Sequence, residues 1–396
     1  MNESRPVLHT RPMAGAALGA VLAAILGSLA PDWVLLSVCA GLIPISAFLL
    51  RKRSVFFLLP LFLFLVLVRM VLLPTSLPND SGISVFLSNL RGALLKNADE
   101  LFRDEAAAAR GILLGDHSVM EAQERAQYAQ SGLLHLFAVS GLHVTILVGM
   151  LGRFVRTENR ILSFTLLALF LLLFCAITGF TASVLRATFV LIGIRLTDLR
   201  ERKTDMPSVF CFAMAMTLLC EPFAYQTISF LLSFAAMAGM VLFGRTFRKP
   251  FPKLLRGTKT VSALSGAAAA TVGMLPVMAY FFGELAWISI PLSILLIPTM
   301  PVILLCGFLS VLLYGIMPHV AAALSYPAYG AIKVISIAAQ NLDVPFLRLP
   351  QPHPLVIALY YLALLLCSPL FLPNRKRPPW LGLGLLAVSI FLWFLV

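Results

Sequence analysis

Charged side chains are scarce in this sequence, and acidic ones are the scarcest. Of the 396 residues, 12% are Asp, Glu, Lys or Arg, whereas 60% are hydrophobic. The mean hydropathy is +0.95. A soluble domain of this length could not bury that much apolar surface. The composition therefore excludes a water-soluble globular protein and indicates a protein of the membrane.

Motifs for cofactors, metals and processing are also missing. The six cysteines are scattered in or beside apolar runs without metal-ligand spacing, so we interpret them as small buried hydrophobic residues. The first apolar run, Met13–Ala30, lacks a clear small-residue cleavage site and is expected to be a retained helix. No internal repeat is evident. We predict no catalytic residue, no bound metal and no cofactor.

The excess of basic residues has a topological explanation. The chain carries 30 Lys and Arg against 17 Asp and Glu, a net charge of +13, which taken alone would suggest a nucleic-acid partner. The basic residues, however, cluster in short loops on alternate sides of the apolar runs, as the positive-inside rule demands. This pattern places the N-terminus in the cytoplasm and the C-terminus outside. The clusters are Arg51–Arg53, Arg153 to Arg160, Arg200 to Lys203, Arg245 to Lys259 and Arg375–Arg377.

The apolar runs predict an all-α, polytopic membrane protein with about 12 or 13 transmembrane helices. Three prolines, Pro291, Pro298 and Pro301, interrupt residues 287–314, which favours a broken or re-entrant segment that lines a cavity. Residues 319–343 either span or lie on the outer surface. The other expected helices cover about 13–30, 33–50, 54–73, 132–150, 161–178, 183–197, 207–220, 225–243, 261–282, 355–372 and 380–396.

Residues 74–130 break the apolar pattern. From Ser81 to about Gly115, apolar and charged residues interleave as in an amphipathic helix, and a polar helix, Glu121–Gln130, follows. Such a segment is expected to lie on the outer leaflet of the membrane. The sequence therefore divides into N-terminal transmembrane helices (1–73), an extracytoplasmic segment (74–130), a transmembrane domain (131–373) and a C-terminal transmembrane helix (374–396).

The run from Gly132 to Val144 opens an apolar segment and yet contains His135, Ser140, Gly141 and His143. Lipid solvates such groups poorly, so they should face protein or water. A Ser-Gly pair is also a place where a helix can bend or unwind. On these residues alone, an ordinary membrane helix with satisfied histidines is favoured over a functional site.

Other polar residues occur within later apolar runs. Arg186 lies inside the run 183–197, where an arginine costs about 2.5–3.5 kcal/mol at the membrane centre unless its side chain reaches the interface. Ser229 and Ser233 lie in the run 225–243.

Several of these stretches resemble the ComEC family of competence proteins. The run His135–Val144 is similar to the family signature H-L-x-A-V-S-G-L-H-V, and Leu113–Asp116 and Ser183–Ala187 are similar to L-L-G-D and S-x-L-R-A. The chain departs from the family at Leu231, where glutamine is usual, and at Ser293, where asparagine is usual.

The resemblance implies a membrane channel that carries single-stranded DNA into the cytoplasm during natural transformation, with residues 131–373 as the channel domain. It also implies separate partners: a DNA receptor, a nuclease, a cytoplasmic motor or single-strand-binding protein, membrane lipids and a possible homo-oligomer. The family's OB-fold and metallo-β-lactamase-like domains are not found, and no H-x-H-x-D-H stretch occurs. Candidate channel-lining or DNA-contacting residues are His135, Ser140, Gly141, His143, Arg186, Ser229, Ser233, Asp116 and Ser293.

Other classes of function remain open at this stage. A secondary transporter for a small anion would also use broken helices and an intramembrane arginine. A non-conducting, competence-related scaffold is suggested by Leu231 and Ser293. An intramembrane metalloenzyme is the weakest alternative, because His135 and His143 lack the H-E-x-x-H arrangement. A carboxylate such as Asp116 near His135 would be one way to hold a metal or an imidazole.

Overall fold

The computed structural model describes residues 12–29, 42, 58–72, 82–131, 133, 137, 141–154, 159–199, 201, 203–252, 258–285, 296, 299–341, 347–368 and 379–395. This part of the chain is helical apart from two short strands, β1 (Glu284–Leu285) and β2 (Leu347–Arg348), which pair with each other. The predicted all-α class is therefore confirmed. The chain forms two compact units, which alternate along the sequence.

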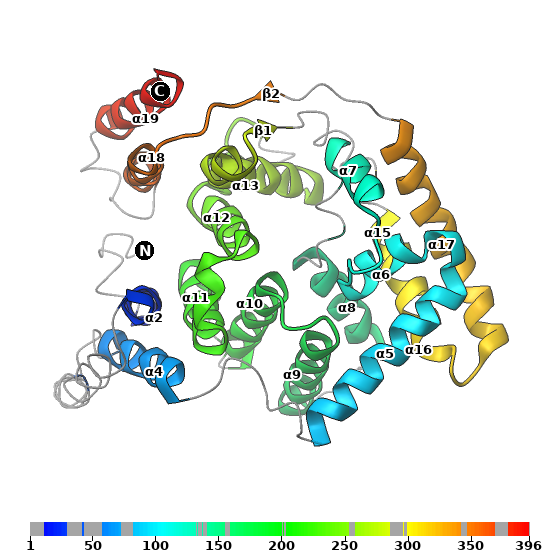
Figure 1. Ribbon diagram of the computed structural model, residues 1–396. Helices are drawn as coiled ribbons and strands as arrows, with labels where there is room; N and C mark the ends of the chain where they lie inside the picture. The colour runs from blue at the N-terminus through cyan, green and yellow to red at the C-terminus, as the bar shows by residue number, and fades with distance from the viewer. Residues whose placement is uncertain are drawn as a thin grey trace. The chain divides into compact units, whose positions relative to one another are not determined.

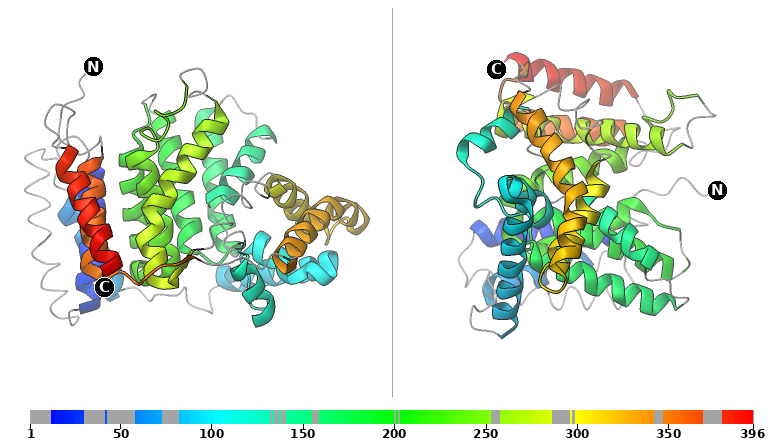
Figure 2. Two further views of the ribbon diagram at one scale, coloured as in Figure 1. Left: turned by 90° about the horizontal axis from the view of Figure 1, so that it is seen from above. Right: turned by 90° about the vertical axis from the view of Figure 1, so that its right-hand side faces the viewer.

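Unit 1 comprises residues 1–75, 203–285 and 348–396. Helix α2 packs against α4 and α11, α12 packs against α13, and α18 packs against α19; the last pair lies side by side in both Figure 1 and Figure 2. The helices of this unit are α2 (Pro12–Leu29), α4 (Leu58–Leu72), α11 (Met206–Cys220), the 3-10 turn η4 (Pro222–Gln226), α12 (Ile228–Phe243), α13 (Lys259–Phe282), α18 (Pro354–Cys367) and α19 (Pro379–Leu395).

Two glycines let α12 and α13 approach more closely than side chains would allow. A Cβ atom added at Gly239 would lie 2.1 Å from the carbonyl oxygen of Ala269, and one added at Gly273 would lie 2.2 Å from that of Ala235. Small residues commonly mediate helix contacts in membranes, where apolar burial drives association weakly. This contact is therefore a specific packing feature of unit 1.

Unit 2 comprises residues 76–202 and 286–347. Helices α8 and α9 both contact α10, while α17 runs beside α5, α6 and α16 (Figure 1). Its helical elements are α5 (Gly82–Phe102), the 3-10 turn η2 (Arg103–Glu105), α6 (Ala106–Leu114), α7 (Ala122–Gln130), α8 (Gly141–Phe154), α9 (Arg160–Ile177), α10 (Ala182–Leu199), α15 (Met300–Val302), the π-helical turn η6 (Ile303–Gly307), α16 (Phe308–Leu313) and α17 (Pro318–Asn341).

Polar side chains fix the start of several helices. Asn159 accepts hydrogen bonds from the backbone N–H groups of Ile161 and Leu162 at the start of α9, and Asp205 caps α11 in the same way. These caps satisfy backbone donors that have no partner within the helix. At the other end, Gly115 closes α6 with a positive φ of 69°, a conformation that favours glycine.

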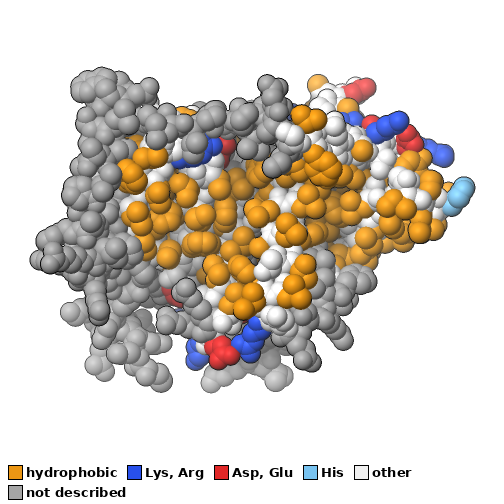
Figure 3. Space-filling model, turned by 90° about the horizontal axis from the view of Figure 1, so that it is seen from below, with side chains coloured by type: hydrophobic (Ala, Val, Ile, Leu, Met, Phe, Trp, Pro, Cys, Tyr) orange, Lys and Arg blue, Asp and Glu red, His pale blue; other side chains and the backbone are white. Residues whose placement is uncertain are grey.

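Three described helical segments are long and apolar enough to cross a membrane: Arg160–Ile177, Leu264–Phe282 and Pro318–Asn341. Shorter apolar helices accompany them, among them α11, α12 and α18. Hydrophobic side chains cover most of the described surface in Figure 3, and charged side chains lie toward its margins. The protein is thus an integral membrane protein, and the total of 12 or 13 spans stays a prediction.

Two predicted helices begin or end differently in the structure. Residues 81–115 were expected to form one helix, but Arg103 has a φ of 47° and the chain there divides into α5, η2 and α6. In the signature run, the helix begins only at Gly141, whereas Ser131, Leu133 and Phe137 are not helical. The broken or re-entrant segment predicted over 287–314 lies partly outside the described residues. The π-helical turn at Ile303–Gly307 was not predicted.

Candidate functional site

Helices α8 and α10 bring two of the predicted site residues together. A Cβ atom added at Gly141 would lie 3.1 Å from a terminal guanidinium nitrogen of Arg186 and 3.7 Å from the Cβ of Ala187. The guanidinium group thus lies against bare backbone at the first residue of α8. His143, on the same helix, is 2% exposed. These contacts link the histidine-containing motif directly to the S-x-L-R-A motif.

Arg186 lies largely within the protein. Its Nε atom is buried and has no hydrogen-bond partner among the described residues, and the same holds for the hydroxyl of Thr181, which directly precedes α10. An unsatisfied donor on a charged group is costly in a medium of low dielectric constant. The site therefore favours an acceptor, such as water or an anionic group, near Arg186.

The remaining predicted site residues lie elsewhere or outside the described part. Ser229 is exposed and Ser233 is buried, both on α12 of unit 1, and the Ser233 hydroxyl has no partner among the described residues. His135, Ser140 and Ser293 lie outside the described residues. Their proposed roles in a channel stay predictions.

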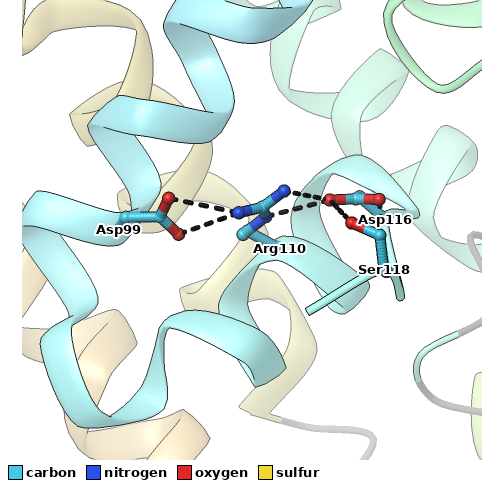
Figure 4. Close-up of polar contacts among 4 residues, drawn as sticks. All are labelled: Asp99, Arg110, Asp116 and Ser118. Atoms are coloured by element: carbon cyan, nitrogen blue, oxygen red, sulfur yellow. Dashed lines mark hydrogen bonds and ion pairs between the residues drawn. The ribbon is translucent and has the colours of Figure 1, made fainter. Parts of the chain in front are cut away.

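Asp116 belongs to a charged cluster that is separate from the α8–α10 contact. Arg110 of α6 lies between two carboxylates (Figure 4): its Nε donates to Asp116 at 2.9 Å, and its Nη1 donates to Asp99 of α5 at 3.1 Å. The Ser118 hydroxyl also donates to Asp116. This cluster joins α5, α6 and the loop after α6.

The Arg110 cluster holds Asp116 in its charged form. Burial would raise the pKa of the Asp116 carboxyl, but hydrogen bonds from Arg110 and Ser118 outweigh this effect and leave the pKa below its usual value. Since this carboxylate already accepts from several donors, its position is explained by structure without a bound ligand. The L-L-G-D motif thus ends a helix with Gly115 and fixes the following turn with Asp116.

A second polar cluster was not predicted from the sequence. Glu105 is 5% exposed and accepts from Ser336 of α17, and Lys333 lies 2.8 Å from both Glu105 and Asp104. The Ser336 hydroxyl also lies 2.8 Å from that of Tyr128 in α7. A lysine within an apolar helix signals that an acidic partner exists, but sequence alone does not identify which one.

This cluster attaches α17 to the amphipathic segment. Hydrogen bonds from Lys333 and Tyr329 lower the pKa of Asp104, so this carboxyl stays charged at neutral pH. No group of three or more His, Cys, Asp and Glu residues in the described ranges is arranged to hold a metal ion. At the α8–α10 contact, the half-buried guanidinium of Arg186 lies beside the backbone of Gly141.

The α8–α10 contact lies in a part of the chain that matches a known protein family. Residues 112–373, about two thirds of the chain, match the model of the family described as "Competence protein". The chain belongs to the competence protein family. The match includes α8 and α10 and extends to the region after α18, so the Gly141–Arg186 contact lies inside the competence domain. The resemblance predicted from the sequence motifs is confirmed.

The chain spans about a fifth to a half of the length of the curated relatives that it matches. It is 27% identical to "ComE operon protein 3" of Bacillus subtilis over 66% of this chain and 34% of that protein. It is 26% identical to "Recombination protein 2" of Haemophilus influenzae over 40% of this chain and 22% of the relative. An uncharacterised protein of Aquifex aeolicus is 29% identical over 57% of this chain and 52% of its own length. No solved structure matches the chain significantly.

Proposed function

We propose that this chain forms the passage by which single-stranded DNA crosses the cell membrane into the cytoplasm. The observation that carries the proposal is the half-buried guanidinium of Arg186, with its buried Nε, against Gly141 inside the matched domain. A strand carries one negative charge per nucleotide and sheds counterions as it enters. A fixed cation beside open backbone offers the passing phosphates a partner within the membrane.

The remaining lining would be neutral and wet. Thr181 supplies a hydroxyl directly before the start of α10, five residues before Arg186, and backbone dipoles of irregular segments supply further polar groups, as in other pores. In this role the chain is a channel and not an enzyme. Its partners would be single-stranded DNA, membrane lipids, and separate receptor, nuclease and motor or single-strand-binding proteins, with homo-oligomer formation possible. The N-terminus would be cytoplasmic and the C-terminus extracytoplasmic.

The test of this function is DNA internalisation by competent cells. Cells that carry the gene should protect labelled DNA from added nuclease, whereas a deletion strain should bind the same DNA at its surface without protecting it. Reintroducing the gene should restore protection. Equal protection in the deletion strain would reject a role in membrane passage, and reduced surface binding would point to an earlier step.

A large side chain at Gly141 is expected to block the passage more than the same side chain at Gly149, another glycine of α8. In Gly141→Leu the new side chain would displace the Arg186 guanidinium, since a Cβ alone comes within 3.1 Å of it. In Gly149→Leu, on the same helix, a Cβ meets nothing within 4 Å. Nuclease-protected DNA should fall at least about tenfold for the first variant, which corresponds to a rise of about 1.4 kcal/mol in the barrier.

The pair of variants separates a local effect from a general one. Both substitutions place leucine in α8, and immunoblots of isolated membranes should show equal amounts of the two proteins. The proposal would lose its support if Gly141→Leu and Gly149→Leu took up DNA to the same extent.

A further inference from the structure

A cavity of about 460 Å³ lies between the start of α9 and the end of α10, away from the Gly141–Arg186 contact. Two cations, two anions, one serine (Ser163) and two apolar side chains line it. The charged lining residues are Arg160, Arg195, Asp198 and Glu201, and the apolar ones are Phe164 and Leu199. All of them belong to unit 2.

The position of the cavity along α9 puts it at the boundary between lipid and water. Arg160 is the first residue of α9, a candidate membrane span with a mean hydropathy of 2.5. Immediately after it, Ile161 and Leu162 are exposed, and Leu169 is exposed further along. Apolar side chains exposed on a membrane span face acyl chains, so the headgroups of those lipids reach the level of Arg160.

The charges in the cavity are paired only weakly. Arg160 and Glu201 form an ion pair at 2.6 Å with side chains 65% and 75% exposed. Arg195 and Asp198 are 3.9 Å apart and 51% and 54% exposed. Exposed pairs of this kind contribute little to stability and exchange readily with other partners. The four groups are therefore available to a ligand that carries both signs of charge.

The backbone at Glu201 adds a second indication. Glu201 has a φ of 53°, a conformation in which glycine or asparagine is usual. A glutamate here is unfavourable for the turn itself. Its carboxylate nevertheless lines the cavity and pairs with Arg160, which is consistent with a requirement for an acid at this position.

We infer that this cavity binds the headgroup of a zwitterionic phospholipid with a primary ammonium group, of the phosphoethanolamine class. The phosphate would accept from Arg160 and Arg195, since guanidinium groups match phosphate oxygens well. The ammonium would donate to Asp198 and Glu201, and the acyl chains would continue along Ile161 and Leu162. An anionic lipid without an amine leaves the two acids without a partner, and a choline headgroup has no N–H to donate.

Native mass spectrometry of the full chain tests this assignment. The protein is purified in detergent and exposed in turn to phosphatidylethanolamine, phosphatidylglycerol and phosphatidylcholine with the same acyl chains. We expect tighter retention of phosphatidylethanolamine by at least about fivefold over both others. Arg195→Gln should weaken that retention about tenfold, because a hydrogen bond to a charged group is lost. Glu201→Gln should chiefly reduce the preference over phosphatidylglycerol.

Matched controls keep the outcome decisive. Lys96→Gln breaks another exposed ion pair, with Glu100, outside the cavity, and should leave lipid retention unchanged. Soluble glycerophosphoethanolamine should compete poorly, because it has no acyl chains. Equal retention of the three lipids by the unaltered protein would overturn the inference without reliance on any variant. Competition by the soluble headgroup as strong as that of the lipid would also overturn it, as would unchanged retention in Arg195→Gln.

Discussion

Replacing Arg186 with alanine is expected to reduce DNA internalisation by about 100-fold or more. A unit charge about 4 Å from a phosphate contributes about 4 kcal/mol at an effective dielectric constant of about 20. If losing this interaction raises the barrier to passage by even three quarters of that amount, transport slows by more than two orders of magnitude. Arg186→Lys keeps the charge without the planar guanidinium and should retain an intermediate level of uptake.

The comparison needs an arginine in a similar setting. Arg69 lies in the last turn of α4, a short apolar helix, and Arg69→Ala should keep at least half of the normal uptake. The measurement is nuclease-protected labelled DNA, normalised to the amount of protein in isolated membranes. Normal uptake by Arg186→Ala at normal protein levels would show that the buried cation is not used in transport. A small-anion transporter would instead show solute uptake that depends on Arg186 while DNA entry does not.

Substituting Gly273 with alanine is expected to separate α12 from α13. The added Cβ would lie 2.2 Å from the Ala235 carbonyl oxygen and 3.0 Å from the Gly239 backbone, so two helix backbones must move apart. Overpacking of this kind costs about 1–3 kcal/mol or more. The apparent unfolding temperature in detergent should therefore fall by about 1–4 °C, as measured by size-exclusion chromatography after heating.

Gly266 provides the matched control on the same helix. A Cβ added there meets nothing within 4 Å, and alanine favours the helix more than glycine does. Gly266→Ala should therefore leave the unfolding temperature unchanged or slightly higher. If both alanine variants unfolded at the temperature of the original protein, the close approach of α12 and α13 would be incorrect.

Local signals predicted much of the helical structure. Helices were expected over 207–220 and 225–243, and the structure has helices at Met206–Cys220 and Ile228–Phe243. Such boundaries are predictable because the breaking residues and caps, such as Asp205 and Thr227, lie next to the helix ends that they define. The family was equally accessible, because its motifs are short and continuous.

Interactions between distant residues were not predictable in the same way. The sequence singled out Asp116 and Arg186, but it did not indicate that Asp116 pairs with Arg110 or that Arg186 lies against Gly141. Lys333 is separated from its partner Glu105 by more than 200 residues. Periodicity and composition report on a residue's own helix, whereas these contacts depend on how helices pack.

Photo-cross-linking to DNA during uptake tests the central claim most directly. A benzophenone side chain replaces Thr181, five residues before Arg186, in one strain, and the exposed Leu169 of α9 in another. Cells that are taking up labelled single strands are then irradiated. The account predicts DNA adducts at position 181 and none at 169, where the side chain faces lipid. Internalised DNA with no adduct at 181, or with equal adducts at both positions, would contradict a passage beside Arg186.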